Sequence, residues 1–479
     1  MKKNFCIVGS GMAAANAALT LLERGHTVEM FDYGKEDKKF PKRGSSFQNI
    51  KKDHISSLKF FYGSEVNDIT YKKTDEELFK YPSRRVGISY TNFYKQKKSN
   101  FNPYFGNVKG GLGTAWGANI ASFTDSDLID FPIKYDELKT YYKKAFERMA
   151  LQSSNSYDNL TEQINPDFPK PLNKPLEHQD LNLCKDLEKV NSFDFRSGQS
   201  RLAIRGEGKN ACTNSGLCIW GCPENSIYSP LETLKKCFEF KAFKYNSNTV
   251  VKRFTSNGRG KLTKIVYTEN GVEKHKKIEN VVLGAGALNS GIILLSTVNG
   301  DRIEPGGKLS SIGLLDTKVI KIPFIHIPSL AYRFNTSKIQ FNRLVSIFKV
   351  GSKSFPKWIQ VELLGLGSLI YHPMIKRIGL GVKISTKIFN FLKSGLFVAT
   401  IFLPDKMSKE NRIIVHFSNK EVKEVEFRYT QTNESLNLEN ATLLKLKKIL
   451  IRAKCIFYPF LRITPDLGSG IHYAGTIPM

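Results

Sequence analysis

The sequence is short of acidic residues. Its 479 residues contain 44 Asp and Glu against 72 Lys and Arg, which gives a formal net charge of +28. Such an excess reflects either a lysine-rich solvated surface or attraction to an anionic partner, namely a membrane face, an acidic polysaccharide or nucleic acid. The chain carries no zinc-finger, RNA-recognition or helix-turn-helix signature. We therefore expect no nucleic-acid binding.

Cysteine is also scarce. There are seven cysteines, an odd number, and the opening residues MKKNFCIVGSGM run straight into a strand and a glycine loop without the pattern of a signal peptide. These features exclude a secreted scaffold stapled by disulfides. They predict a reducing, cytoplasmic location.

Long apolar runs are absent, and no run reaches the length of a membrane-spanning helix. Residues 363–404 nevertheless contain no Asp or Glu, while apolar residues there alternate with five bases. The segment is either an amphipathic surface at a membrane interface or a core-facing helix with its lysines turned to solvent, and the pattern favours the second. The five bases are Lys376, Arg377, Lys383, Lys387 and Lys393.

Length and composition are those of a globular protein. Hydrophobic residues make up 41% of the chain and charged residues 24%. The chain is about three times as long as a usual domain. We expect two closely packed domains or one large one.

A dinucleotide-binding pattern opens the chain. Residues 5–8 form an apolar strand, and Gly9, Gly11 and Ala14 follow in G-x-G-x-x-A spacing before a helix and a second strand that ends at Asp32. The first glycine permits a tight turn, the second lets a pyrophosphate approach the backbone, and the alanine lets helix and strand pack closely. The acid is placed to accept hydrogen bonds from a ribose.

Further segments decide between the dinucleotides. Residues 109–118, KGGLGTAWGA, form a glycine-rich loop around one tryptophan, and 281–290, VVLGAGALNS, form a strand that leads into a helix after a predicted β-meander. The last residues include HYAGTIPM, and 128–142 read LIDFPIKYDELKTYY. Taken in order, these segments resemble the glucose–methanol–choline (GMC) family of flavoprotein oxidoreductases. Residues 300–450 match no motif of that family, whose substrate domain varies.

The resemblance implies a fold and a domain order. The fold would be α/β, with a doubly wound, Rossmann-like FAD-binding domain interrupted by an α+β substrate domain that has an antiparallel sheet. The predicted parts are 1–150 (FAD domain, first part), 151–240 (cysteine-containing insertion or substrate region), 241–300 (FAD domain, second part), 301–460 (substrate domain) and 461–479 (start of an incomplete C-terminal FAD and catalytic segment).

The resemblance also implies site residues. Ala115 stands where some carbohydrate oxidases of the family carry a flavin-linked histidine, so FAD should be non-covalent. His472, in H-x-x-G-T-x-x-M, would take the proton of a substrate hydroxyl while a hydride passes to flavin N5, since imidazole is neutral near pH 7. The implied cofactor contacts are Gly9, Gly11, Ala14 and Asp32 at the ADP half, Val251 at the adenine, and Gly110, Gly111, Thr114 and Trp116 near the isoalloxazine.

A cysteine cluster stands apart from the flavin motifs. Cys212, Cys218 and Cys222 follow C-x5-C-x3-C-P spacing in a glycine-containing loop. Zinc normally needs four ligands in paired C-x2-C units, whereas iron–sulfur clusters use thiolates in loops that end in C-P. The motif resembles that of GMC sugar dehydrogenases whose catalytic subunits carry a [3Fe–4S] cluster. Structural cysteines that pack a loop are the alternative.

The predicted function is an FAD-dependent dehydrogenase that oxidises a CH–OH group of a sugar or saccharide. Its partners would be this small molecule and an electron acceptor, such as a redox protein, with peripheral membrane contact left open. Two alternatives remain: an oxidase that passes electrons to oxygen, and an inactive flavin-fold chain. The family motif containing His472 normally has a longer continuation than the seven residues present here. We therefore expect a truncated chain or one that a partner chain completes.

Overall fold

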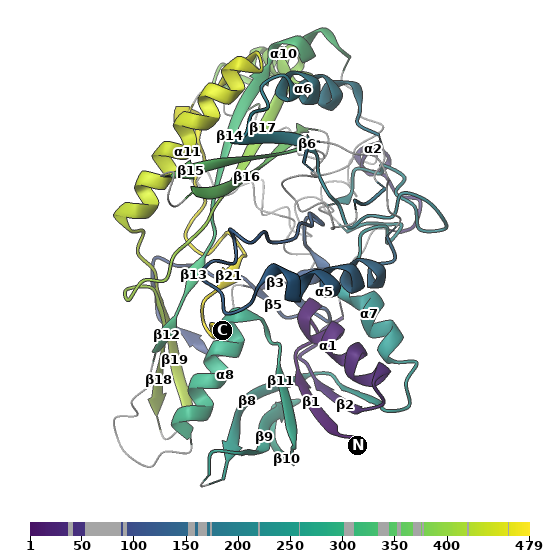
Figure 1. Cartoon of the computed structure of the whole chain (residues 1–479), viewed down its shortest axis with the longest axis vertical. Helices are drawn as coiled ribbons and strands as arrows, with labels where there is room; N and C mark the ends of the chain where they lie inside the picture. The colour runs from purple at the N-terminus through teal and green to yellow at the C-terminus, as the bar shows by residue number, and fades with distance from the viewer. Residues whose placement is uncertain are drawn as a thin grey trace.

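The structure is a computed structural model, and its described elements form two halves around the C-terminal residues (Figure 1). One half contains the N-terminus and a parallel sheet, and the other contains a larger antiparallel sheet. The C-terminus lies between them, beside one helix of the first half. The structure describes residues 1–36, 42–52, 88–89, 93–151, 159–160, 170–172, 175–218, 221–257, 259–300, 311–333, 344–351, 356–366, 375, 378–418, 421–457 and 459–479.

Short apolar runs build a four-stranded parallel sheet. Helices cover one face of this sheet and a β-meander covers the other, so the inner strand of residues 4–8 is buried on both sides, as is usual for parallel sheets. Its order is β11 (Asn280–Leu283), β1 (Asn4–Val8), β2 (Thr27–Phe31) and β7 (Phe243–Asn246). The covering helices are α1 (Met12–Glu23) and α7 (Pro230–Cys237). The predicted meander is present as β8 (Thr249–Ser256), β9 (Leu262–Glu269) and β10 (Val272–Lys277).

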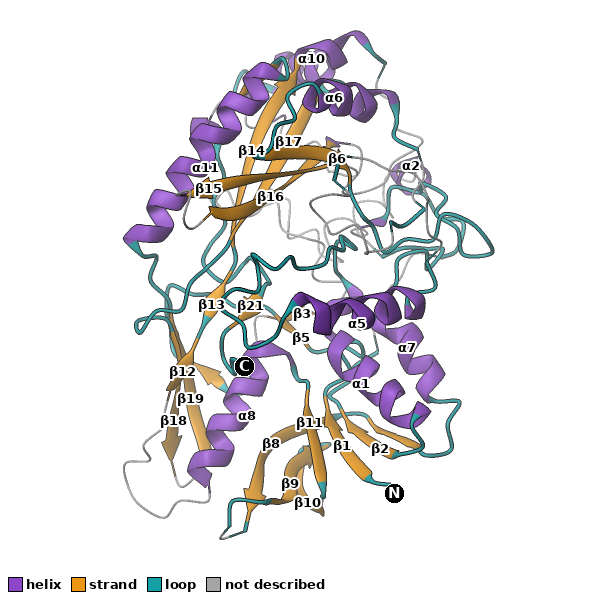
Figure 2. Ribbon diagram, in the orientation of Figure 1, coloured by secondary structure: helices purple, strands orange, loops and turns teal. Residues whose placement is uncertain are grey.

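The second half is built on a six-stranded antiparallel sheet. Helices α6 (His178–Glu188) and α11 (Asn433–Arg452) lie on its outer face and contribute leucines to the largest apolar core (Figure 2). Strand β6 comes from the cysteine-containing region of the sequence, so the chain enters this sheet before it returns to the parallel one. The order is β20 (Cys455–Phe457), β14 (Lys318–His326), β17 (Leu396–Leu403), β16 (Pro356–Gly365), β15 (Leu344–Gly351) and β6 (Phe195–Gln199).

Smaller elements join the halves. Helix α8 (Gly286–Gly300) packs on a four-stranded sheet of β12 (Ser311–Gly313), β18 (Arg412–Ser418), β19 (Glu421–Arg428) and β4 (Lys95–Gln96). Two pairs of short strands are β13 (Leu315–Asp316) with β21 (Tyr473–Ala474), and β3 (Ile88–Ser89) with β5 (Phe105–Gly106). The remaining helices of the described residues are α2 (Phe47–Lys52), η3 (Gly111–Thr114), α5 (Tyr135–Arg148), η5 (Ile327–Ala331), α10 (Val382–Leu392) and η7 (Pro459–Leu461).

Alternation along β14 determines which face of the antiparallel sheet is polar. Ile320, Ile322 and Phe324 are buried in the core under the outer helices. Since successive side chains of a strand point to opposite faces, Lys321 is presented on the inner face. The domain boundaries predicted from the sequence stay predictions.

Candidate active site

Two glycine loops that are far apart in sequence meet at the start of α1. A Cβ atom placed on Gly111 would lie 3.8 Å from Cα of Gly11, and one placed on Gly11 would lie 4.0 Å from the carbonyl oxygen of Gly110. Gly110 and Gly111 both have positive φ, at 89° and 56°, a conformation that favours glycine. The loop of residues 109–118 therefore lies beside the N-terminus of the first helix.

The two predicted phosphate-loop glycines have different environments. A Cβ on Gly9 would come within 2.5 Å of the carbonyl oxygen of Gly284, and its φ is +92°, so packing of the protein itself requires this glycine. A Cβ on Gly11 would meet nothing closer than 4.0 Å. The first turn of α1 carries no acidic residue, and Gly11 caps it without a side-chain hydrogen bond. The position of Gly11 thus combines open space with the positive end of a helix.

Asp32 lies at the end of β2 in a hydrogen-bonded chain that links three elements. Its Oδ2 atom accepts a short hydrogen bond from Ser10 Oγ and another from Tyr245 OH at 2.8 Å, while the amide N–H of Gly110 donates to Ser10 Oγ at 2.8 Å. Burial raises the pKa of Asp32, although the hydrogen bonds from Ser10 and Tyr245 oppose this shift. The acid is therefore fixed relative to both glycine loops.

Ala14 and Val251 are buried in the core. A Cβ on Gly284 would lie 2.9 Å from Cβ of Ala14, so small residues at both positions allow α1 to approach the sheet. The side chain of Val251 packs with Val8 and Phe31. Any contact between Val251 and an adenine would have to come from its backbone, and this role stays a prediction.

Thr114 and Trp116 hold the second glycine loop in shape. Thr114 Oγ1 donates to the carbonyl oxygen of Gly111 at 2.9 Å. The indole N–H of Trp116 donates to the carbonyl oxygen of Tyr228 at 2.7 Å, and the two rings pack edge to face. These contacts attach the loop to the segment that precedes α7.

His472 lies where the two halves meet. Its carbonyl oxygen accepts from the Thr317 N–H at 3.3 Å, and its ring packs edge-on against Phe402 of β17, with ring centroids 5.6 Å apart. His472 is exposed to solvent, although neighbouring protein partly desolvates its imidazole. Burial therefore lowers the pKa of His472, while a hydrogen bond to Gly470 opposes the shift. The neutral imidazole is the form that can accept a proton.

Three polar side chains lie in register on the sheet face that also carries Phe402. Lys321 pairs with Thr400 across β14 and β17, and Thr400 pairs with Glu362 across β17 and β16. Directly opposed residues share a face, as do residues two apart in a strand. Asn119, next to the second glycine loop, donates from Nδ2 to Glu362 Oε1 at 3.0 Å. This face is therefore turned toward the glycine-loop half.

The charges in this group are strongly desolvated. Burial lowers the pKa of Lys321 to about 8, and the carboxylate of Glu362 opposes that shift. Burial raises the pKa of Glu362, which Asn119 and Lys321 oppose. The half-buried ammonium of Lys321 and the buried carboxylate of Glu362 can form hydrogen bonds with polar groups that displace water from the sheet face.

Asp316 attaches the His472 segment to β13. Its Oδ2 atom accepts from the Gly468 N–H at 2.9 Å, and its backbone pairs with Tyr473. Oδ1 is buried and has no hydrogen-bond partner among the described residues. Burial raises the pKa of Asp316 to about 7, with Asp405 adding to the rise. Asp316 thus holds the segment around His472 against β13 through its side chain and its backbone.

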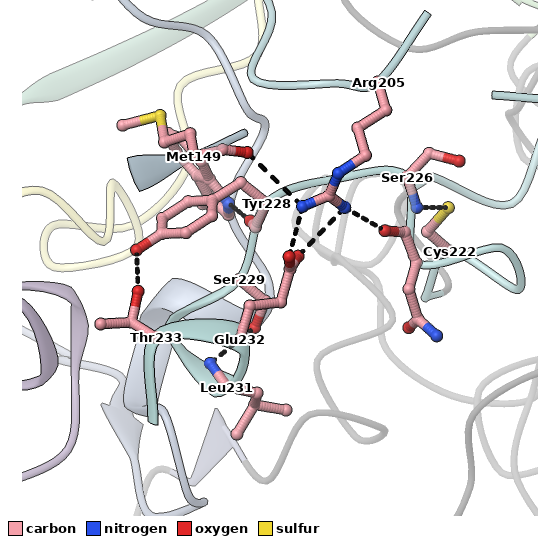
Figure 3. A network of polar contacts seen from close by, with 11 residues as sticks. Met149, Arg205, Cys222, Ser226, Tyr228, Ser229, Leu231, Glu232 and Thr233 are labelled. Atoms are coloured by element: carbon pink, nitrogen blue, oxygen red, sulfur yellow. Dashed lines mark hydrogen bonds and ion pairs between the residues drawn. The ribbon is translucent and has the colours of Figure 1, made fainter. Parts of the chain in front are cut away.

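The cysteine segment is folded by polar contacts around Arg205 (Figure 3). The guanidinium donates to the carbonyl oxygens of Asn225, at 2.9 Å, and Met149, at 3.4 Å, and it pairs with Glu232 of α7. The Ser226 N–H donates to Cys222 Sγ at 3.3 Å. Arg205 therefore ties the cysteine segment to the helices beside the glycine loops.

The thiols do not form a recognisable metal centre. Across the described ranges, no group of three or more His, Cys, Asp or Glu side chains lies close enough to hold a metal ion. The residues as placed do not fit a three-iron cluster on Cys212, Cys218 and Cys222, and the cluster stays a prediction without structural support. The other four cysteines are buried: Cys6, Cys184, Cys237 and Cys455.

Sequence reasoning missed the residues of the antiparallel sheet. Lys321, Thr400 and Glu362 lie in no motif, and Asn119 follows a motif without belonging to it. One signal in the sequence could have indicated Lys321. The stretch KVIKIPFIH alternates as a strand does, so this lysine and the isoleucines on either side of it point to opposite faces of the sheet. Pairing partners across a sheet cannot be read from such a pattern.

The sequence matches no family model and no curated protein. The structure is similar to pyridoxine 4-oxidase from Mesorbium loti, with a TM-score of 0.56 and 13% identity over 94% of this chain and 80% of that one. It is also similar to formate oxidase, with a TM-score of 0.58 and 11% identity over 99% of this chain and 89% of that one. At these identities the likeness shows the fold alone. It is the α/β GMC fold, a parallel sheet with an antiparallel substrate-domain sheet, which confirms the predicted fold class.

Proposed function

We propose that this chain is an FAD-dependent oxidoreductase that acts on CH–OH groups with His472 as the base. The observation that carries the proposal is the placement of His472 against a polar sheet face, in a fold whose other half presents two converging glycine loops. The proposed chemistry uses the helix N-terminus and the sheet face in the arrangement that the structure has.

The residues present fit non-covalent FAD. Gly11 leaves open space at an uncapped helix N-terminus, which suits a pyrophosphate. Gly286, where a Cβ would also meet nothing within 4 Å, begins α8 without an acid in its first turn. Asp32 would accept a ribose hydroxyl, and Gly111, where a Cβ would meet nothing closer than 3.8 Å, would let the isoalloxazine approach the backbone. A Cβ on Gly110 would lie 2.6 Å from Cγ2 of Thr114, so packing of the loop itself requires that glycine. Ala115 offers no atom for a covalent link.

The chain's own residues would move a single proton. FAD, when bound, would supply a two-electron acceptor for the hydride of the carbon that bears the hydroxyl. The ring nitrogen of His472 that is not bonded to Gly470 takes the hydroxyl proton, so the alcohol becomes a carbonyl and charge balances. The lowered pKa keeps this base neutral at pH 7.

The substrate that the inner face favours is a sugar or saccharide. Lys321 donates hydrogen bonds, Glu362 accepts them, and Thr400 between them does both. Neighbouring strands are about 4.8 Å apart, so the three side chains form a row that can contact successive hydroxyls of a polyol. An unsubstituted apolar alcohol would offer these groups no hydrogen bonds in place of those that water makes.

The electron acceptor has two candidates. Dehydrogenase activity with a protein or dye acceptor is the first. Oxygen-dependent activity is the second, because both structures described above are named as oxidases. Peroxide formation on an oxygen electrode, compared with dye reduction under nitrogen, decides between them.

The decisive experiment is anaerobic bleaching of the flavin spectrum. Purified protein saturated with FAD should be yellow and should lose its absorbance when a candidate sugar is added. His472→Ala should bind FAD equally well and bleach about 10²–10⁴ times more slowly, which is the usual contribution of a general base. His178→Asn, an exposed histidine of α6, is the matched control.

The pH dependence sharpens this test. The rate should fall as pH decreases through the pKa of His472, below the ordinary value near 6.5, because the imidazolium cannot accept a proton. Folded protein that stays colourless with excess FAD would refute the proposal, as would unchanged bleaching by His472→Ala.

A further inference from the structure

Helix α10 leaves large apolar side chains in solvent. Val382 is 82% exposed, Ile384 55% and Phe391 72%, and Leu380 in the preceding turn is 56% exposed. On its other side the helix packs through Phe389 against Leu366 and Val398, which lie on the antiparallel sheet half. The helix is thus apolar on both sides, unlike the core-facing helix with a polar outer side that the sequence pattern favours.

Basic residues accompany these apolar side chains. Lys383 and Lys387 are exposed on α10, and Lys393 follows its last residue. Within the described residues, none of the three pairs with a carboxylate. Since residues four apart on a helix are neighbours, Lys383 and Lys387 form one edge, and Ile384 and Phe391, seven apart, form the adjacent stripe. Lys376 and Arg377 lie outside the described residues.

The helix lies at an end of the molecule. Figures 1 and 2 place α10 beside α6, at the end of the antiparallel half that is opposite the N-terminus and the meander. A flat surface can therefore reach α10 without meeting the parallel-sheet half.

We propose that α10 and its flanking residues Leu380 and Lys393, here called the α10 face, dock on a phospholipid bilayer that contains anionic lipids. Exposed apolar side chains beside lysines, with no acid in 363–404, are the chemistry of an interfacial helix that lies in the membrane plane. No described helix is long and apolar enough to cross a bilayer.

Charge repulsion argues against a second copy of this chain as the partner that covers the α10 face. In a two-fold dimer through the α10 face, Lys383 and Lys387 would approach their own copies without carboxylates between them. A bilayer with anionic headgroups offers the opposite charge to the lysines and hydrocarbon to Ile384 and Phe391.

The test is co-sedimentation of the full chain with vesicles. Phosphatidylcholine vesicles that contain phosphatidylserine should bind the protein, and vesicles of phosphatidylcholine alone should bind it at least about tenfold more weakly. Replacing Lys383, Lys387 and Lys393 by Gln should weaken binding about 100-fold, since each lysine near an anionic surface contributes roughly fivefold. The double variant Ile384→Ser with Phe391→Ser should lose at least about tenfold. These side chains are exposed, so both variants should fold.

The matched control is on α5. Tyr141→Ser with Lys143→Gln and Lys144→Gln removes an exposed aromatic residue and two lysines from a helix that also carries acids. It should bind vesicles as the unchanged protein does. Equal losses in the α5 and α10 variants would show attraction by net charge alone and overturn the proposal. So would a lipid-free dimer that the Ile384 and Phe391 substitutions dissociate.

Discussion

The parallel-sheet half and the antiparallel half differ in whether their candidate site residues form a recognisable sequence motif. The first would bind a dinucleotide through its backbone: Gly11 and Gly111 leave room for a ligand that a side chain would fill, and glycines at fixed spacing are visible in any sequence. The second presents Lys321, Thr400 and Glu362, which are brought together only by strand pairing. Backbone recognition leaves a motif, whereas side-chain recognition on a sheet leaves none.

The largest expected effect is a loss of FAD affinity, and it should distinguish two glycines of one motif. Gly11→Val should reduce FAD affinity by about 100-fold or more with little change in melting temperature, because its side chain enters the ligand's space and not the protein's. Gly9→Ala should instead lower the melting temperature markedly, since its Cβ would meet the Gly284 carbonyl at 2.5 Å with a φ of +92°. Flavin titration and thermal unfolding measure both. If both variants only unfold the protein, the open space at Gly11 has no ligand role.

The next effect concerns the antiparallel half. Lys321→Met should lower kcat/KM for the substrate about 10- to 100-fold, because a hydrogen-bonding site then loses its donor, while flavin affinity is unchanged. Lys318→Met is the control: Lys318 is on the same strand but pairs with Glu439 of α11. It should cost stability without changing kcat/KM. Equal kinetic losses in the two variants would mean that Lys321 acts only through the fold.

A smaller effect is expected where the halves join. The folded pKa of Asp316 is raised to about 7, so its contribution to stability is fully present below the unfolded value near 3.8 and is lost as pH rises through about 7. Asp316→Asn keeps an acceptor for the Gly468 N–H and does not titrate. Relative to the unchanged protein, its free energy of unfolding should rise between pH 4 and pH 8 by roughly 2–4 kcal/mol. Denaturant unfolding at several pH values measures this, and a pH-independent difference would contradict it.

The smallest effect expected concerns the cysteine segment. Cys218→Ser should leave FAD content unchanged, because Arg205 holds Asn225 and Glu232 through its own guanidinium contacts and the substitution keeps a side chain of similar size. Iron and sulfide analysis of anaerobically prepared protein tests the cluster hypothesis separately. About three irons per chain, lost in Cys218→Ser, would establish the cluster and show that the thiols converge when iron binds. Absence of iron after anaerobic reconstitution would leave the three cysteines as packing residues.

The sequence by itself determined the phosphate-loop half and the fold class. Strand β1, the helix after Gly11, the meander and the strand before α8 all lie where the local pattern predicts them. The physical reason is that each depends on short-range rules: apolar periodicity, glycine conformational freedom and the charge at a helix end. The role of His472 was predicted in the same way, through a motif that is contiguous in sequence, and it stays a prediction.

Only the tertiary structure decided what surrounds His472 and what α10 exposes. The row of Lys321, Thr400 and Glu362 depends on the register of three strands that are far apart in the chain, and a shift of one residue would turn each side chain to the other face. Likewise, the composition of the 42 residues 363–404 allowed two interpretations, an amphipathic surface at a membrane or a core-facing helix. Only the packing of α10 on the antiparallel half shows that Ile384 and Phe391 are exposed beside Lys387. Burial depends on which residues surround a side chain in the folded protein, and a short stretch of sequence does not reveal them.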